Sequence, residues 1–168
     1  MALFSIKLEN LRQLFVKELR DLYDAEKQIT EALPEMIDAA NHPELKQALQ
    51  EHLQVTEQQI SRLDRIFQML QEDPAGESCK GMKGLLKEGE EFVSAGGDPS
   101  TIDAGIITAA QRVEHYEMAG YGTVRTYAEL LGQHEMARLL QETLDEEKEA
   151  DETLSDIASS VNVESKAA

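Results

Sequence analysis

Residues 101–132, TIDAGIITAAQRVEHYEMAGYGTVRTYAELLG, decide the fold of this chain. Their apolar residues recur mostly at helical spacing, which is typical of a helix with one buried face. These residues are Ile106, Ala110, Val113, Tyr121, Val124, Ala128 and Leu131. Gly132-Gln133 then predicts a turn, and the same pattern continues from His134 to Val161. Because the connection is short, residues 101–161 are predicted to form an antiparallel helical hairpin.

The first part of the chain predicts a second hairpin, over residues 5–71. One helix is expected from residue 5 or 7 to residue 40, and Pro34 inside it should kink or interrupt it. A turn at residues 41–43 leads into another amphipathic helix, which ends near residue 71.

Residues 72–100 are predicted to form a crossover between the hairpins, with one short helix at residues 82–93. Strand signals are almost absent, so the fold class is all-α. Two antiparallel hairpins joined by a long crossover make the ferritin-like version of a four-helix bundle. We expect one domain over residues 1–161 and a disordered tail at residues 162–168.

Composition narrows the range of partners and compartments. The 168 residues carry a formal net charge of −17, which disfavours nucleic acid and anionic membranes as partners. No apolar run approaches the roughly 20 residues that a membrane helix needs. A single cysteine, Cys79, excludes an intramolecular disulfide, so we expect a reducing compartment, most simply the cytoplasm.

Glutamates interrupt the apolar faces of all four long helices. They are Glu26, Glu57, Glu114, Glu117 and Glu147. Carboxylates are seldom buried without a partner. Residues at equal distance from a hairpin turn lie side by side, which pairs Glu26 with Glu57 and Glu117 with Glu147. Their convergence predicts a carboxylate-rich metal site in the bundle core.

A set of carboxylate ligands that includes no cysteine sulfur suits a hard cation such as Mn, Mg or Ca, or a pair of non-haem irons. The alternative is that these glutamates lie at the boundary of the core. There they would reach water or pair with Lys27, Lys148 or Arg62.

Several stretches resemble a known family. DLYDAEKQI (21–29), CKGMKGLLKEGEE (79–91) and AAQRVEHYEMAGYGT (109–123) are similar to the bacterial YciE/YciF-type ferritin-like proteins, which are associated with stress responses. VEHYEMAGYGTVRTYAELLG (113–132) and LLQETLDEEKEADETL (139–154) also resemble the second half of rubrerythrin-type proteins. The resemblance implies a rubrerythrin-like bundle and a homodimer.

The resemblance also implies that the five glutamates occupy the positions of the di-iron ligands in rubrerythrin-type proteins. The family pattern places a histidine three residues after the glutamate of the second and fourth helices. Here Ile60 and Ala150 stand at those positions, so both nitrogen ligands are missing. His52 or Asp151 could replace the missing ligands. However, His52 lies more than a turn before Glu57, and a lone histidine at such a position is more often a hydrogen-bonded residue at the boundary of the core.

Tyr121, one turn from Glu117, is the tyrosine best placed to hydrogen-bond a core carboxylate. The leading hypothesis is a ferritin-like, stress-associated metal protein with Fe or Mn, and with Mg or Ca as further options. If it is an enzyme, redox or peroxide chemistry at the metal is favoured. The alternative is a non-catalytic helical scaffold with a degenerate metal site. Iron storage is a third option, but it requires a closed cage.

Overall fold

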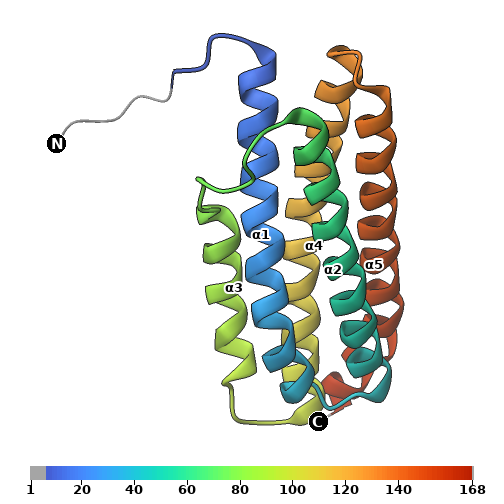
Figure 1. Ribbon diagram of the computed structural model, residues 1–168. Helices are drawn as coiled ribbons and strands as arrows, with labels where there is room; N and C mark the ends of the chain where they lie inside the picture. Colours follow the sequence, from blue (N-terminus) through green and yellow to red (C-terminus); the bar gives the residue numbers. More distant parts are fainter. Residues whose placement is uncertain (1–6, 168) are drawn as a thin grey trace, which may run out of the picture.

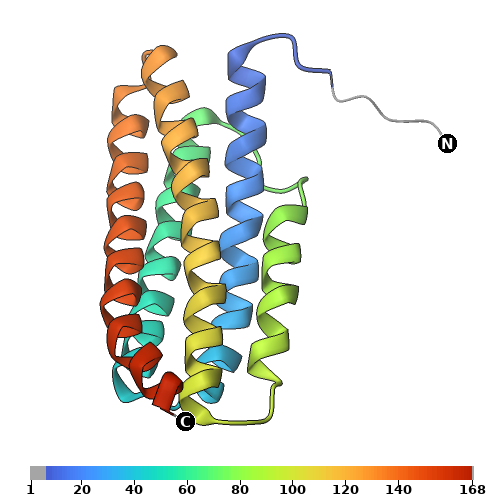
Figure 2. The same ribbon diagram turned by 180° about the vertical axis from the view of Figure 1, so that it is seen from behind.

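The structure is a computed structural model that describes residues 7–167. Its helices are α1 (Leu11–Ala39), α2 (Pro43–Leu70), α3 (Lys80–Val93), α4 (Pro99–Leu130) and α5 (His134–Ala167). Figures 1 and 2 show the long helices α1, α2, α4 and α5 side by side, with the shorter α3 packed outside against α1 and α4. The predicted all-α bundle, with two antiparallel hairpins and a long crossover that carries a short helix, is confirmed.

Local capping explains where two of the helices begin. The side chain of Asn10 accepts a hydrogen bond from the backbone N–H of Gln13 at 2.9 Å, which starts α1 at Leu11. Of the two starts predicted, residue 5 lies outside the described residues and residue 7 was wrong, because residues 7–10 are not helical. The helix continues through Pro34 without the predicted interruption. Asp98 accepts from the N–H of Thr101 at 2.8 Å, so α4 begins slightly earlier than residue 101.

The C-terminal end of α5 is longer than predicted. Residues 162–167, expected as part of a disordered tail, continue the helix, and residue 168 lies outside the described part of the chain. Val161 is buried in the core, and the Ser165 hydroxyl lies 2.8 Å from the hydroxyl of Thr101 at the start of α4. These contacts hold the end of α5 against α4, which the polar composition of residues 162–168 did not indicate.

Asp103 fastens the turn between α1 and α2 to the beginning of α4. Its carboxylate accepts hydrogen bonds from the backbone N–H groups of Asn41, at 2.8 Å, and His42, at 2.7 Å. Asp103 is only 2% exposed, so these charge-assisted bonds are made in a buried place. The two hairpins are therefore held at a defined depth relative to each other.

The crossover is anchored at the start of α3. The backbone N–H of Cys79 donates to Asp24 at 2.7 Å, and its buried thiol donates to Asp21 at 3.0 Å. The hydroxyl of Tyr116, on α4, donates to the same Asp21 oxygen at 2.8 Å. Cys79 therefore helps to dock α3 onto α1 and α4.

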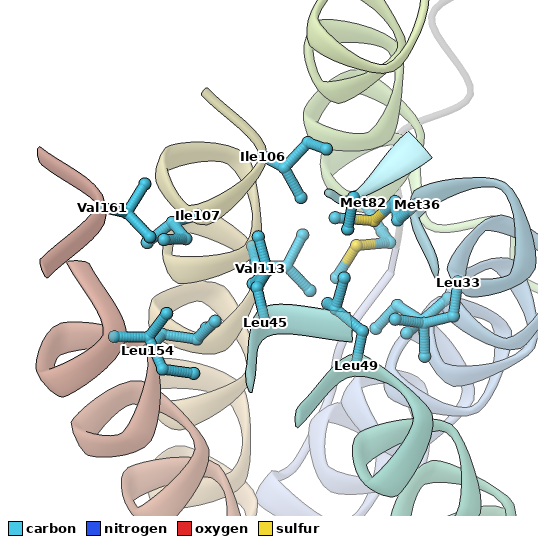
Figure 3. Packing of buried hydrophobic residues seen from close by; sticks show 14 of the residues in the cluster. Leu33, Met36, Leu45, Leu49, Met82, Ile106, Ile107, Val113, Leu154 and Val161 are labelled. Atoms are coloured by element: carbon cyan, nitrogen blue, oxygen red, sulfur yellow. The ribbon is translucent and has the colours of Figure 1, made fainter. Parts of the chain in front are cut away.

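A polar layer divides the hydrophobic core into two clusters. The α1–α2 turn cluster includes Leu33, Leu49, Val113 and Leu154, and Figure 3 shows its side chains converging from several helices. The α4–α5 turn cluster lies at the opposite end of the bundle and includes Phe15, Leu63 and Tyr121. The buried polar residues at depths between these clusters are Glu26, Thr56, Gln59, Glu114, Glu117, Thr143 and Glu147.

Candidate metal centre

Four buried glutamates from three helices form the carboxylate cluster: Glu26 on α1, Glu114 and Glu117 on α4, and Glu147 on α5. Each occupies a position of the apolar stripe on its own helix; Glu26, for example, lies between Leu22 and Ile29. Glu26, Glu117 and Glu147 are 0% exposed, and Glu114 is 3% exposed. Glu114, Glu117, Glu147 and the nearby His52 each offer one ligand atom, and these atoms all lie within 4.8 Å of one another.

Neighbouring side chains orient two of these carboxylates. The Tyr121 hydroxyl donates a hydrogen bond to Oε1 of Glu26 on α1, which confirms the prediction that this tyrosine bonds a core carboxylate. The side-chain amide of Gln59 donates to Oε1 of Glu147, and also to Oε2 of Glu146 at 3.1 Å. Each carboxylate thus has one oxygen held in place, and its other oxygen, Oε2, has no hydrogen-bond partner in the described part of the chain.

The second helix contributes different residues from the one predicted. Glu57 is exposed, so the prediction that it lies in the core was wrong. Thr56 and Gln59 are buried instead, and His52 faces the cluster with its Nε2 atom 3.5 Å from Oε1 of Glu114. The predicted pairing of Glu26 with Glu57 at one level is therefore absent, and α2 supplies an imidazole and an amide.

The spacing of the buried residues explains this difference. From Leu45 and Leu49 to Leu63 and Ile66, steps of three and four residues pass through positions 52, 56 and 59. Those positions hold polar side chains, so the apolar residues of the sequence pattern are Leu53 and Ile60, about a third of a turn away. Steps of three and four residues, continued inward from the buried leucines at both ends of α2, predict that positions 52 and 59 face the core.

Asp151, the other residue considered as a further ligand, lies outside the carboxylate cluster. Its carboxylate accepts a hydrogen bond from Gln111 at 3.1 Å and lies 3.3 Å from Nε2 of the exposed His115. These contacts place it on the partly exposed side of the α4–α5 pair, where it acts on Glu114 only through its charge.

The electrostatics of the layer oppose ionisation of its carboxyl groups. Burial raises the pKa of Glu26, Glu114 and Glu117 well above the ordinary value, and the charge of Glu147 raises all three further. Burial also lowers the pKa of His52, which favours the neutral imidazole that a metal requires. Without a cation, Glu26, Glu114 and Glu117 therefore hold their protons to higher pH than an exposed glutamate does.

The unpartnered atoms of this layer test whether the residues fit a metal ion. Within the described residues, five buried carboxylate oxygens have no hydrogen-bond partner: Glu26 Oε2, Glu114 Oε2, Glu117 Oε1 and Oε2, and Glu147 Oε2. His52 Nε2 and Gln59 Oε1 are also buried without a partner. A buried polar atom left unpaired costs about 1–3 kcal/mol. A divalent cation would satisfy several of these atoms at once, so the residues fit such an ion.

The bases named in the boundary alternative do not neutralise the carboxylate cluster. Arg62 pairs with Glu146 at 2.8 Å, Lys148 pairs with Asp145 at 3.2 Å, and Lys27 lies over the ring of Tyr23. Over residues 7–167, no lysine or arginine forms an ion pair with any of the four clustered glutamates.

Fold and site together define an all-α bundle protein with a buried carboxylate cluster. The chain belongs to the family described as "Domain of unknown function (DUF892)", which matches residues 10–168. It is similar to Protein YciF of Escherichia coli (strain K12), with 40% identity over 154 residues that cover 91% of this chain and 93% of that protein. The resemblance to YciE/YciF-type proteins is confirmed.

Solved structures agree with this assignment. The crystal structure of the E. coli stress protein YciF matches with a TM-score of 0.89 at 39% identity, covering 92% of this chain and 98% of that one. YcfI from Rhodopseudomonas palustris matches with a TM-score of 0.86 at 43% identity, covering 90% and 97%. None of the helices described over residues 7–167 combines the length and apolar character needed to cross a membrane.

Proposed function

We propose that this protein binds one or two divalent ions, iron or manganese, in the carboxylate cluster and takes part in stress-associated redox or peroxide chemistry. One observation carries the proposal. Four glutamates lie buried between two hydrophobic clusters, without a lysine or arginine partner among the described residues. Desolvating ionised carboxylates costs several kcal/mol per ion, and a bound cation is the simplest compensation.

The surroundings of each side chain indicate its role toward a metal. Neither oxygen of Glu117 accepts a hydrogen bond within the described residues. Besides burial, the charges of Glu26, Glu147 and Glu114 all raise the pKa of Glu117, so it is central in the cluster and suits a bridging position. Tyr121 and Gln59 hold one oxygen of Glu26 and one of Glu147, which leaves the other oxygen of each for the ion. His52 offers a single nitrogen ligand.

This donor set supports iron or manganese. Magnesium and calcium prefer oxygen ligands alone, whereas an imidazole beside carboxylates suits Fe²⁺ and Mn²⁺. A redox-active ion would supply electron exchange with oxygen or peroxide. The apolar residues on both sides of the layer keep bulk water away, which strengthens the interaction of each carboxylate with a cation.

The link to stress rests on relatives. YciF of E. coli, whose crystal structure matches this chain at 39% sequence identity, is described as a stress protein. We extend that association to this chain. A homodimer and a cytoplasmic location remain predictions from the sequence.

The non-catalytic scaffold with a degenerate site is the competing hypothesis. It predicts core carboxylates that pair with bases or contact bulk water, and the described residues show neither arrangement. Protonation of the buried carboxyl groups, which their raised pKa values favour, is the form of this hypothesis that remains. The scaffold hypothesis draws support from Ile60 and Ala150, which stand where the family pattern has histidines. That support is weaker because His52 brings an imidazole to the cluster.

Metal analysis of the purified protein tests the proposal. We expect wild-type protein loaded with Fe²⁺ or Mn²⁺ and then desalted to retain about one or two ions per chain, measured by inductively coupled plasma mass spectrometry. The double variant Glu117→Ala/Glu147→Ala should retain almost none, because it loses the central carboxylate and the one that Gln59 orients.

Glu57→Ala is the matched control, because Glu57 is an exposed glutamate of the same bundle and should not change the metal content. Circular dichroism establishes that all three proteins are folded. Equal, near-zero metal content in the three would remove the proposal.

A further inference from the structure

A half-open cavity of about 260 Å³, with exposed residues in its lining, lies in the bundle beside the carboxylate cluster. Residues of all five helices line it, and its walls are largely aliphatic. Ile29, Leu33, Leu49, Val113 and Leu154 are buried members of these walls. Several of them appear among the converging side chains in Figure 3.

The cavity reaches the candidate metal centre. His52 and Glu114 belong both to its lining and to the residues grouped around the candidate ion. Glu114 is 3% exposed, and its Oε2 atom has no hydrogen-bond partner in the described part of the chain. The Nε2 atom of His52 is buried and equally unpartnered. An apolar chamber with a few polar atoms at one place is typical of a small-molecule site.

The charges around the cavity limit what can enter it. Glu51 and Glu149 are exposed lining residues, and Glu146 is a half-buried one that pairs with Arg62 at 2.8 Å. No lysine or arginine lines the cavity within the described chain, and Glu51 and Glu149 form no ion pair there. This acidic surrounding repels anions and admits neutral or cationic molecules.

Size gives a second limit. An apolar cavity of about 150 Å³ accommodates benzene, so one of about 260 Å³ has room for roughly two fused rings or a short hydrocarbon chain. We infer that this cavity binds a small apolar molecule without negative charge, and that the hydrogen-bonding end of the ligand lies against His52 and Glu114. Such a ligand would be the substrate class of the metal centre, a role that rests on the proposed function.

The probe for this inference is 2-naphthol, compared with 2-naphthoate, which has the same rings and a negative charge. The chain contains no tryptophan, so naphthalene fluorescence can be excited without competing emission from indole. We expect 2-naphthol to bind with micromolar affinity, and 2-naphthoate to bind at least about tenfold more weakly. Replacing Glu51 and Glu149 with lysine should reverse that preference.

Ala48→Phe tests the location, because Ala48 is a half-buried lining residue and a phenyl ring there would occupy the cavity. We expect it to weaken 2-naphthol binding at least about tenfold. Ala119→Phe is the matched control on an exposed face of α4, and it should bind as the wild type does. If Ala48→Phe fails to fold by circular dichroism, Ala32→Phe fills the same cavity from α1.

Unchanged 2-naphthol binding in the folded cavity-filling variant, or equal affinity for 2-naphthoate, would overturn the inference. Metal content measured on the same samples separates it from the proposed function. Binding of 2-naphthol that Ala48→Phe abolishes, in protein that retains no metal, would support the cavity as a binding site while removing the metal proposal.

Discussion

Adding saturating Mn²⁺ to the metal-free protein is expected to raise its thermal midpoint by roughly 8–16 °C. An ion that binds only the folded state stabilises it by about 4 kcal/mol at a concentration 1,000 times its dissociation constant. For a chain of this size, about 1 kcal/mol corresponds to a shift of roughly 2–4 °C. Differential scanning calorimetry of protein treated with a chelator, with and without Mn²⁺, measures the effect.

The Glu117→Ala/Glu147→Ala variant is the control for this prediction, and its midpoint should stay the same with and without the ion. Anaerobic Fe²⁺ should act as Mn²⁺ does, whereas Mg²⁺ should have a smaller effect because the site includes an imidazole. If the wild-type midpoint does not respond to Mn²⁺ or Fe²⁺, the scaffold hypothesis is favoured.

Glu117→Gln is expected to make the metal-free protein more stable than the wild type at pH 8. Burial and the neighbouring glutamates raise the pKa of Glu117 well above its ordinary value of 4.5. At pH values between the pKa of Glu117 in the unfolded state and its pKa in the folded state, the folded state binds more protons. The free energy of unfolding therefore falls as pH rises through this range, and it is fully retained at pH values below the unfolded-state pKa. A neutral amide at position 117 removes this loss.

The difference between the two proteins should grow by about 1.4 kcal/mol per pH unit above the unfolded pKa, until the folded pKa is reached. Urea unfolding from pH 5 to pH 8, with a chelator present, measures it. Glu57→Gln, at an exposed position, should follow the wild-type curve. Parallel curves for wild type and Glu117→Gln would contradict the assigned burial and charge coupling of Glu117.

Metal reverses the direction of this pH dependence. A cation replaces the protons on the carboxyl groups, so its binding releases protons and becomes stronger as pH rises. The wild type should therefore gain stability from Mn²⁺ most at pH 8, where the metal-free protein is weakest. Glu117→Gln should gain less stability from Mn²⁺ than the wild type does, but it should be more stable without metal. Such a trade-off between stability and function is common at functional sites.

Much of the fold and part of the site follow from helical periodicity. The burial of the four glutamates of α1, α4 and α5 was predicted correctly, because apolar neighbours flank each of them at helical spacing. Glu117, for example, lies between Val113 and Tyr121, which are both buried. The pattern on α2 led to the wrong residue because the polar side chains of His52, Thr56 and Gln59 occupy the inward positions there. Functional positions are where hydrophobic patterning is expected to fail.

Other features depend on contacts that no local pattern encodes. The helical end of α5 depends on Val161 and on the contact between Ser165 and Thr101, residues far apart in the chain. The role of Gln59 depends on Glu147, which lies on a different hairpin. His52 was assigned to the boundary of the core because one helix alone does not show which carboxylates will face it.

A crystal structure of the protein grown with Mn²⁺ or Fe²⁺, with anomalous data collected at the metal absorption edge, tests the central claim most directly. We expect an anomalous peak among Glu114, Glu117, Glu147 and His52, with Glu26 adjoining it. A map without a peak there, in which these carboxylates are protonated and hydrogen-bonded to one another or to water, would contradict the account.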